Sequence, residues 1–186
     1  MLKQRNEQVQ AAARALDMVV CVIAFFAAYH LRDSDLELFA KQGSIEPIDS
    51  LTWLLGMSIV LHLITYPLVG FYESLRMKSV PDIISMVSRA GIIEFFVAAA
   101  MVFLVQAKTT SRYFFGLFLL INYTLILLEK LSVRLLLSII RTRGYNFRKV
   151  LVVGTGSHAA RMIDTLQKHA HWGYVPTGVL RGSGDH

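Results

Sequence analysis

The chain has 186 residues, of which 54% are hydrophobic and only 17% charged, and its mean hydropathy is +0.50. This composition is too apolar for an ordinary water-soluble domain, so we expect a membrane protein. The formal net charge of +6 does not indicate a nucleic-acid partner, because the Lys and Arg residues lie at the ends of apolar runs and form no basic stripe interleaved with aromatic residues.

Metal and disulfide chemistry has no support in the sequence. Cys21 is the only cysteine and lies in an apolar run, so we interpret it as a small residue that faces lipid or another helix. The six histidines form no HExxH pattern, and only His169 and His171 lie close together. The sequence therefore predicts no metal site.

Four apolar segments predict transmembrane helices, since a bilayer core of about 30 Å requires about 20 mostly apolar helical residues. The second segment meets this requirement, whereas Asp17 and Glu94 interrupt the first and third, whose lengths also suit buried core helices. Pro67 is predicted to bend or end the second helix, and the fourth is predicted to continue past the lipid to about residue 143, before Gly144. The predicted spans are residues 15–31, 51–72, 90–107 and 113–128.

The basic residues predict the orientation of these helices. Lys and Arg are concentrated before the first span, between the second and third spans, and after the fourth, whereas the other two loops hold few. Because basic loops stay on the cytoplasmic side of a membrane, both termini are predicted to be cytoplasmic. A signal peptide is the alternative for the first segment, but Glu7, Asp17 and the lack of a clear cleavage site disfavour it.

The sequence changes in character after Gly144. Residues 150–153 form a β-branched run that is typical of a buried parallel strand, residues 154–173 indicate a turn and a helix, and residues 174–180 a second strand. We therefore predict an all-α membrane domain of four transmembrane helices in residues 1–143, followed by an incomplete α/β Rossmann-like βαβ unit in residues 144–186.

A glycine turn joins the first predicted strand to its helix. Its pattern is G-x-G-x-x-A from Gly154 to Ala159, which makes Gly154, Gly156 and Ser157 candidates for binding the phosphates of a nucleotide cofactor. A purely structural tight turn is the alternative. Arg181 stands where an acidic ribose-binding residue is expected, and Asp185 comes only four residues later. A lone βαβ unit forms no complete ligand crevice, so we expect the chain to be the N-terminal part of a longer protein.

Polar residues within the predicted spans are interpreted as structural. Asp17, Arg89 and Glu94 lie near the predicted cytoplasmic face, where snorkelling or mutual pairing lowers their cost. His62 and Asn122 lie deeper, and we expect them to make hydrogen bonds between helices rather than to line a pathway. The cytoplasmic part offers no set of residues for acid-base or nucleophilic catalysis, so no catalytic residue is predicted.

Several stretches together resemble the N-terminal half of the polyprenyl-phosphate hexose-1-phosphate transferases, large membrane phosphoglycosyl transferases of bacteria. The resemblance covers nearly the whole chain in order, and the run from Arg141 to Gly156 is its most specific part. The stretches are LDMVVCVIAFFAAYHLR, GFYESLRMKSVPDIISMV, KTTSRYFFGLF, RTRGYNFRKVLVVGTGSHAARMIDTL and WGYVPTGVL.

The resemblance implies a multi-pass protein of the bacterial inner membrane that transfers a sugar-1-phosphate from a nucleotide-sugar to undecaprenyl phosphate and so initiates surface polysaccharide synthesis. In that family a C-terminal domain carries the catalytic Asp-Glu pair and uses Mg²⁺. These 186 residues hold no counterpart of that domain. The resemblance thus implies a membrane-anchoring and regulatory or assembly region with the lipid bilayer as its partner, no cofactor or catalysis of its own, and substrates bound elsewhere.

Two other interpretations stay open. Membrane-anchored nucleotide-sugar dehydratases and epimerases also resemble four spans followed by a Rossmann segment, and there the glycine turn would be an NAD site. The other interpretation is a non-catalytic membrane assembly module. The sequence leaves open whether the spans form a homodimer. Ser111-Arg112 and the stretch RGYNFRKVLVVG favour the transferases.

Overall fold

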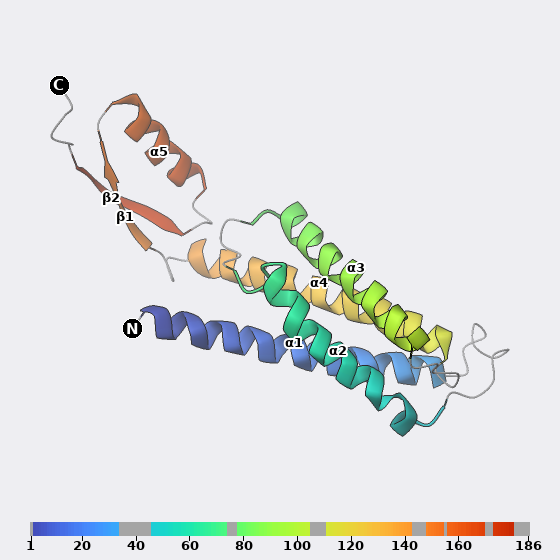
Figure 1. Ribbon diagram of the computed structural model, residues 1–186. Coiled ribbons are helices and arrows are strands. Elements are labelled where there is room, and N and C mark those ends of the chain that lie inside the picture. Colours follow the sequence, from blue (N-terminus) through green and yellow to red (C-terminus); the bar gives the residue numbers. More distant parts are fainter. Residues whose placement is uncertain are drawn as a thin grey trace. The chain divides into compact units, whose positions relative to one another are not determined.

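The structure is a computed structural model that describes residues 2–33, 46–73, 78–104, 111–142, 148–154, 156–169 and 173–180 (Figure 1). The chain divides into two compact units. One comprises Met1–Glu73 and Ser79–Lys130, and the other comprises Ser74–Lys78 and Leu131–His186. The first unit is helical, and the second contains a small parallel sheet with its helix.

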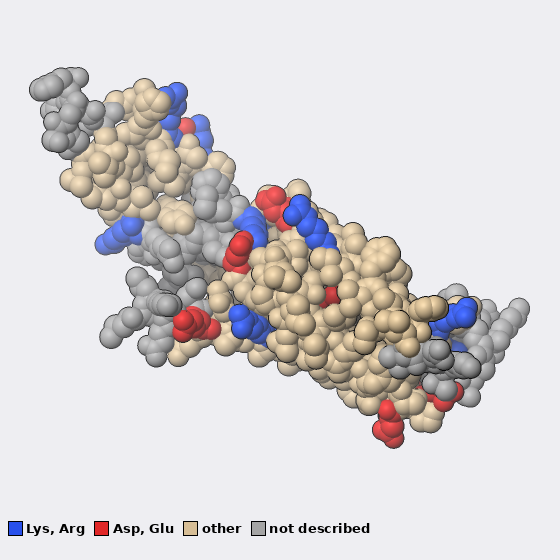
Figure 2. Space-filling model, viewed as in Figure 1, with Lys and Arg blue, Asp and Glu red and all other residues tan. Residues whose placement is uncertain are grey.

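Four long helices make up most of the chain, and consecutive helices run in alternate directions (Figure 1). All four are long and apolar enough to cross a membrane, over residues 7–33, 48–68, 80–104 and 112–140. Figure 2 shows a broad surface with few charged side chains between the two ends of the helical unit. The helices are α1 Leu2–Asp33, α2 Ile48–Leu68, α3 Val80–Leu104 and α4 Arg112–Thr142.

The end of α2 and the start of α3 differ from the predicted spans, because local turn residues and hydrogen bonds determine where these helices end and begin. Helix α2 ends at Leu68 in a Schellman motif, because Gly70 adopts φ 77° and the N–H of Phe71 donates to the carbonyl of Tyr66 at 3.0 Å. Helix α3 begins at Val80 rather than at residue 90, and a capping box explains this earlier start. There the backbone N–H of Ser79 donates to Asp82 Oδ2 at 2.8 Å, and the N–H of Asp82 donates to Ser79 Oγ at 3.3 Å.

The other two long helices show that apolar runs underestimate helix length. Helix α1 begins at Leu2 instead of residue 15, since the polar residues that precede the apolar run are also helical. Helix α4 continues to Thr142, close to the predicted limit of residue 143. Residues 105–107 of the predicted third span, and Gly144, lie outside the described residues.

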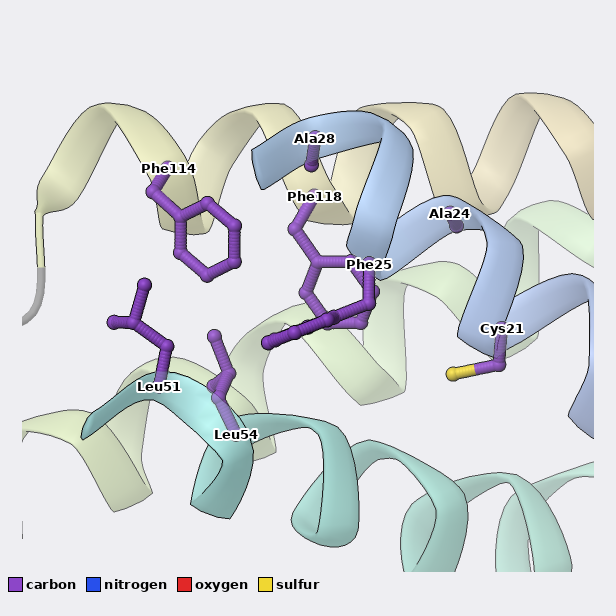
Figure 3. Close-up of a cluster of buried hydrophobic side chains, with 8 residues drawn as sticks. All are labelled: Cys21, Ala24, Phe25, Ala28, Leu51, Leu54, Phe114 and Phe118. Carbon is purple, nitrogen blue, oxygen red and sulfur yellow. The ribbon is translucent and has the colours of Figure 1, made fainter. Parts of the chain in front are cut away.

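The core of the helical unit is built from Phe25 and three small residues on α1 and from large residues on α2 and α4 (Figure 3). The ring of Phe25 meets those of Phe114 and Phe118 edge-on, with centroids 5.4 and 5.6 Å apart. Cys21 lies in this core and faces other helices. The eight core residues are Cys21, Ala24, Phe25, Ala28, Leu51, Leu54, Phe114 and Phe118.

The second unit contains the predicted βαβ arrangement. Strands β1 Arg148–Val153 and β2 Tyr174–Leu180 pair in parallel, with Val152 opposite Val179, and helix α5 Ser157–Lys168 connects them. Helix α5 buries Ala159 and Leu166 of its apolar face, whereas Met162 of the same face is 51% exposed. Parallel pairing with a helical crossover is the local arrangement that the sequence predicts for these residues.

Candidate functional site

The glycine turn between β1 and α5 has the backbone conformation that its sequence predicts. Gly154 has φ 116°, and Gly156 has φ 88° with ψ −161°, a region essentially restricted to glycine. A Cβ atom at either position would meet nothing within 4 Å, so the space above the turn is open. The N–H of Gly154 donates to the carbonyl of Leu180 at 2.8 Å, which ties the turn to β2.

Helix α5 begins at Ser157 directly after this turn. Gly156 occupies its N-cap position and has no side chain, so the first amides of α5 receive no side-chain acceptor from the cap residue. An anion is favoured at such a helix start. Gly154, Gly156 and Ser157 thus lie together on one turn, while Arg181 and Asp185 lie outside the described residues.

A buried ion pair connects α1 to α4 in the helical unit. Lys130 Nζ donates to Asp17 Oδ1 at 2.5 Å and lies 2.9 Å from Glu129 Oε2. Asp17 is fully buried and Lys130 is 3% exposed. Burying both charges is costly, and the pair offsets that cost only while both partners stay in place.

Aromatic residues of the turn after α2 surround this pair. Lys130 Nζ lies 5.3 Å from the centre of the Phe71 ring, and the guanidinium of Arg14 lies 5.1 Å from that of Tyr72. Burial raises the pKa of the Tyr72 phenol, and the negative charge of Asp17 adds to the effect, so this phenol stays protonated at neutral pH. The turn after α2 is therefore held between α1 and α4.

A second polar group confirms the predicted hydrogen bond between helices. Asn122 Nδ2 donates to His62 Nε2 at 3.2 Å, and His62 Nδ1 donates to the carbonyl of Ser58 at 2.7 Å. A carbonyl can only accept, so the hydrogen of the neutral imidazole is assigned to Nδ1. Glu94 Oε1 lies 3.4 Å from Nδ1 without a hydrogen bond, because that hydrogen points to Ser58. This chain of hydrogen bonds joins α2 to α4.

The sequence missed the role of Lys130, which is one of the basic residues after the fourth predicted span and is buried in the helical unit. Asp17 pairs with Lys130 of α4 rather than with Arg89, which is exposed. The missed signal is a four-residue repeat on α4, because Lys130 continues a line of buried positions. These are Phe114, Phe118, Asn122, Ile126 and Lys130.

Among the described residues, no group of three or more His, Cys, Asp or Glu side chains could hold a metal ion. The turn, the strand before it and the helix after it belong to a βαβ unit with a two-stranded parallel sheet, and a glycine turn at a helix start is a local arrangement that suits diphosphate groups. A family model described as a CoA-binding domain matches residues 67–184. The match covers more than half of the chain, which therefore belongs to this family.

The family domain also occurs in some sugar-transferase-related proteins. The matched range begins at Pro67 and so includes α3 and α4 as well as the βαβ unit. No curated protein and no solved structure matches the chain.

The residues of the glycine turn fit the diphosphate part of CoA. Gly154 and Gly156 leave the backbone accessible, and the start of α5 favours a negative group. Binding the adenosine and pantetheine parts of CoA would require further protein surfaces. Leu151 and Val153 alternate with the buried Val152 on β1 and are 51% and 71% exposed, so this face of the strand is open in the described part of the unit.

We predict that replacing Lys130 by Met destabilises the helical unit by about 3–5 kcal/mol, because the carboxylate of Asp17 is left buried without its partner. Thermal unfolding in detergent, followed by circular dichroism, measures the loss. Asp17→Asn combined with Lys130→Met should recover part of it. The control Lys168→Met breaks an exposed ion pair with Asp164 and should change stability by no more than about 0.5 kcal/mol. A Lys130→Met protein as stable as the parent would contradict the interpretation.

We also predict that Gly156→Ala destabilises the βαβ unit by about 1–3 kcal/mol, since alanine does not adopt the backbone conformation of this residue without strain. Hydrogen exchange of the α5 amides reports the change. Ser157→Ala, at the exposed neighbouring position, is the control and should stay within about 0.5 kcal/mol. Equal exchange rates in both variants would show that the turn carries no strain.

Proposed function

We propose that this chain is the membrane-anchoring and regulatory or assembly region of an enzyme that transfers a sugar-1-phosphate from a nucleotide-sugar to undecaprenyl phosphate. The observation that carries this proposal is the continuity of the family match, which runs from Pro67 through two apolar helices into the βαβ unit. A cofactor-binding domain that worked alone in water would not need those helices. The resemblance of the sequence to the N-terminal half of such transferases supports the same proposal.

The helical unit supports a role as a membrane anchor. Its four helices are long and apolar enough to span a bilayer, and many of their outward-facing side chains are large and apolar. Phe96 is 67% exposed and Phe103 82% exposed, which suits contact with lipid better than contact with water. The bilayer is the partner proposed for this surface, in a multi-pass protein of the bacterial inner membrane.

The βαβ unit supports a regulatory or assembly role rather than catalysis. Its open glycine turn suits a diphosphate, while the described residues around it include no paired carboxylates and no nucleophile with a neighbouring base. We therefore assign the transfer reaction, and the Mg²⁺ that it uses, to a domain outside these residues. A nucleotide-sugar dehydratase or epimerase with NAD on the same turn is the second candidate, and the open turn is the observation that favours it.

We predict that membranes containing the complete gene product convert undecaprenyl phosphate to a labelled lipid when given Mg²⁺ and radiolabelled nucleotide-sugars, whereas residues 1–186 alone give none. Thin-layer chromatography of the extracted lipid measures both. Turnover by residues 1–186 would overturn the assignment of catalysis to another domain. NAD-dependent conversion of a nucleotide-sugar by the complete product, with no labelled lipid, would favour the second candidate.

The basic residues before α1, between α2 and α3, and late in α4 predict that the C-terminus is cytoplasmic. A fluorescent protein fused after His186 should therefore be bright, and alkaline phosphatase fused at the same place should be inactive. The reverse pattern of activities would invert the topology. If neither fusion protein were found in the membrane fraction, the proposal that these helices anchor the chain in a membrane would be rejected.

A further inference from the structure

Glu94 of α3 is a buried carboxyl group of the helical unit, and its side chain lacks a cationic partner. It is 5% exposed. Among the described residues, its one ion-pair neighbour within 4 Å is His62, whose Nδ1 lies 3.4 Å from Glu94 Oε1. The buried lysine of α4, Lys130, is already paired with Asp17 and Glu129. An ionised Glu94 would therefore be a buried charge without a cation, unless His62 were protonated.

Two acceptor atoms beside His62 lack a hydrogen. Neither Glu94 Oε1 nor Asn122 Oδ1 has a hydrogen-bond partner in the described part of the chain, and both atoms are buried from solvent. The amide nitrogen of Asn122 already donates to His62, so its carbonyl oxygen is the atom left over. Unpartnered buried acceptors are costly, so this group of side chains needs one more donor.

Water does not supply this donor. Glu94 and Asn122 line a narrow space between α2, α3 and α4 that has no room for a water molecule. Both side chains also line a larger pocket of about 480 Å³ between α3 and α4, but their two unpartnered oxygens have no surface open to it. A donor that reaches these atoms must be smaller than any molecule, which leaves a proton.

The titratable groups of α1 and α2 do not replace such a proton. On α2, the Tyr66 ring packs on His62 with centroids 4.3 Å apart and lines the larger pocket, but its hydroxyl gives no hydrogen to Glu94 Oε1. On α1, Asp17 and Cys21 interact electrostatically with Glu94. Neither is a cation, and the negative charge of Asp17 would repel that of an ionised Glu94.

The titratable groups of α4 are used elsewhere. Lys130 pairs with Asp17, as described above. The hydroxyl of Tyr123 lies 3.0 Å from that of Ser88, and the two share a hydrogen bond. None of these groups donates to Glu94 Oε1.

The hydrogen bonds of His62 fit a neutral imidazole. Its Nδ1 donates to the carbonyl of Ser58 at 2.7 Å, and its Nε2 accepts from Asn122 at 3.2 Å. An imidazolium would carry a hydrogen on Nε2 as well, and that hydrogen would meet the amide hydrogens of Asn122. The geometry thus favours a proton on Glu94 over a proton on His62.

We propose that Glu94 binds a proton and is a neutral carboxylic acid at neutral pH. The neutral acid has a hydrogen to donate, and Asn122, on the wall of the same narrow space, carries an acceptor that lacks one. One proton satisfies both oxygen atoms and connects α3 to α4. Loss of the proton leaves a buried carboxylate without a partner, so the packing of α3 depends on pH. This role does not depend on the glycine turn or on the transfer reaction.

Infrared spectroscopy tests the protonation state, because the carbonyl stretch of a protonated carboxyl group is separate from the bands of a carboxylate. The purified full chain is measured at neutral pH in a maltoside detergent, which has no carbonyl group of its own. We expect a protonated-carboxyl band that is lost in Glu94→Gln. A spectrum in which Glu94→Gln removes no such band would overturn the proposal.

Two further variants are controls for this band. Glu7→Gln removes an exposed carboxyl group of α1 and should leave the band unchanged. Tyr66→Phe removes the hydroxyl nearest in kind to a competing donor, and the band should again persist. A band that appears only in Tyr66→Phe would show that this hydroxyl donates to an ionised Glu94, and the proposal would be wrong.

Nitrogen NMR of labelled histidine tests the same assignment in the parent chain, so it does not depend on the folding of Glu94→Gln. The signal of His62 is identified by its loss in His62→Asn. We expect a neutral ring with its hydrogen on Nδ1 at neutral pH. An imidazolium signal would place the proton on His62 instead and overturn the proposal.

Thermal unfolding at increasing pH tests the consequence for stability. Because the folded chain keeps a proton that the unfolded chain gives up, the melting temperature of the parent should fall relative to that of Glu94→Gln as the pH rises. The glutamine side chain is neutral throughout and has no proton to lose. Parallel melting temperatures across the pH range would show that folding binds no proton at Glu94, which contradicts the proposal.

Discussion

The helical unit depends on the ion pair between Asp17 and Lys130. These residues are 113 positions apart, and their pairing connects the first long helix to the last. Lys130 is also the residue at which the helical unit ends, although α4 itself continues to Thr142. Because neither charge is tolerable alone in an apolar interior, the pair favours arrangements in which α1 and α4 are adjacent over competing packings of four similar helices.

The aromatic core and the ion pair hold α1 and α4 together at different positions along the two helices. Toward the C-terminal end of α1, the edge-on contacts of Phe25 with Phe114 and Phe118 provide close packing. In the bilayer that the proposed function assumes, packing of this kind would be weakly selective between helices, since the lipid chains are as apolar as the side chains. The polar contacts select which helices pack together, because Asp17 and His62 each require a hydrogen-bond donor at one position along the neighbouring helix.

Sequence alone predicted the type of each element better than its ends and its partners. The four apolar runs and the βαβ pattern gave the right elements in the right order, because hydrophobic periodicity reports directly on burial. Helix α3 begins before the apolar run of the predicted span, because the capping box of Ser79 and Asp82 lies outside that run. The pairing of Lys130 was missed because a charge at the end of an apolar helix usually points to solvent, and only the four-residue spacing on α4 indicates that it is buried.

The chain of hydrogen bonds from Asn122 through His62 to Ser58 has a direction, and a peptide carbonyl sets it. That carbonyl has no hydrogen to give, so neither the imidazole nor the amide can be reversed while the imidazole is neutral. The side chain at position 58 takes no part in this assignment. Any helical residue small enough for this buried position would therefore keep the same assignment, and the oxygen of Asn122 would still be the atom left without a partner.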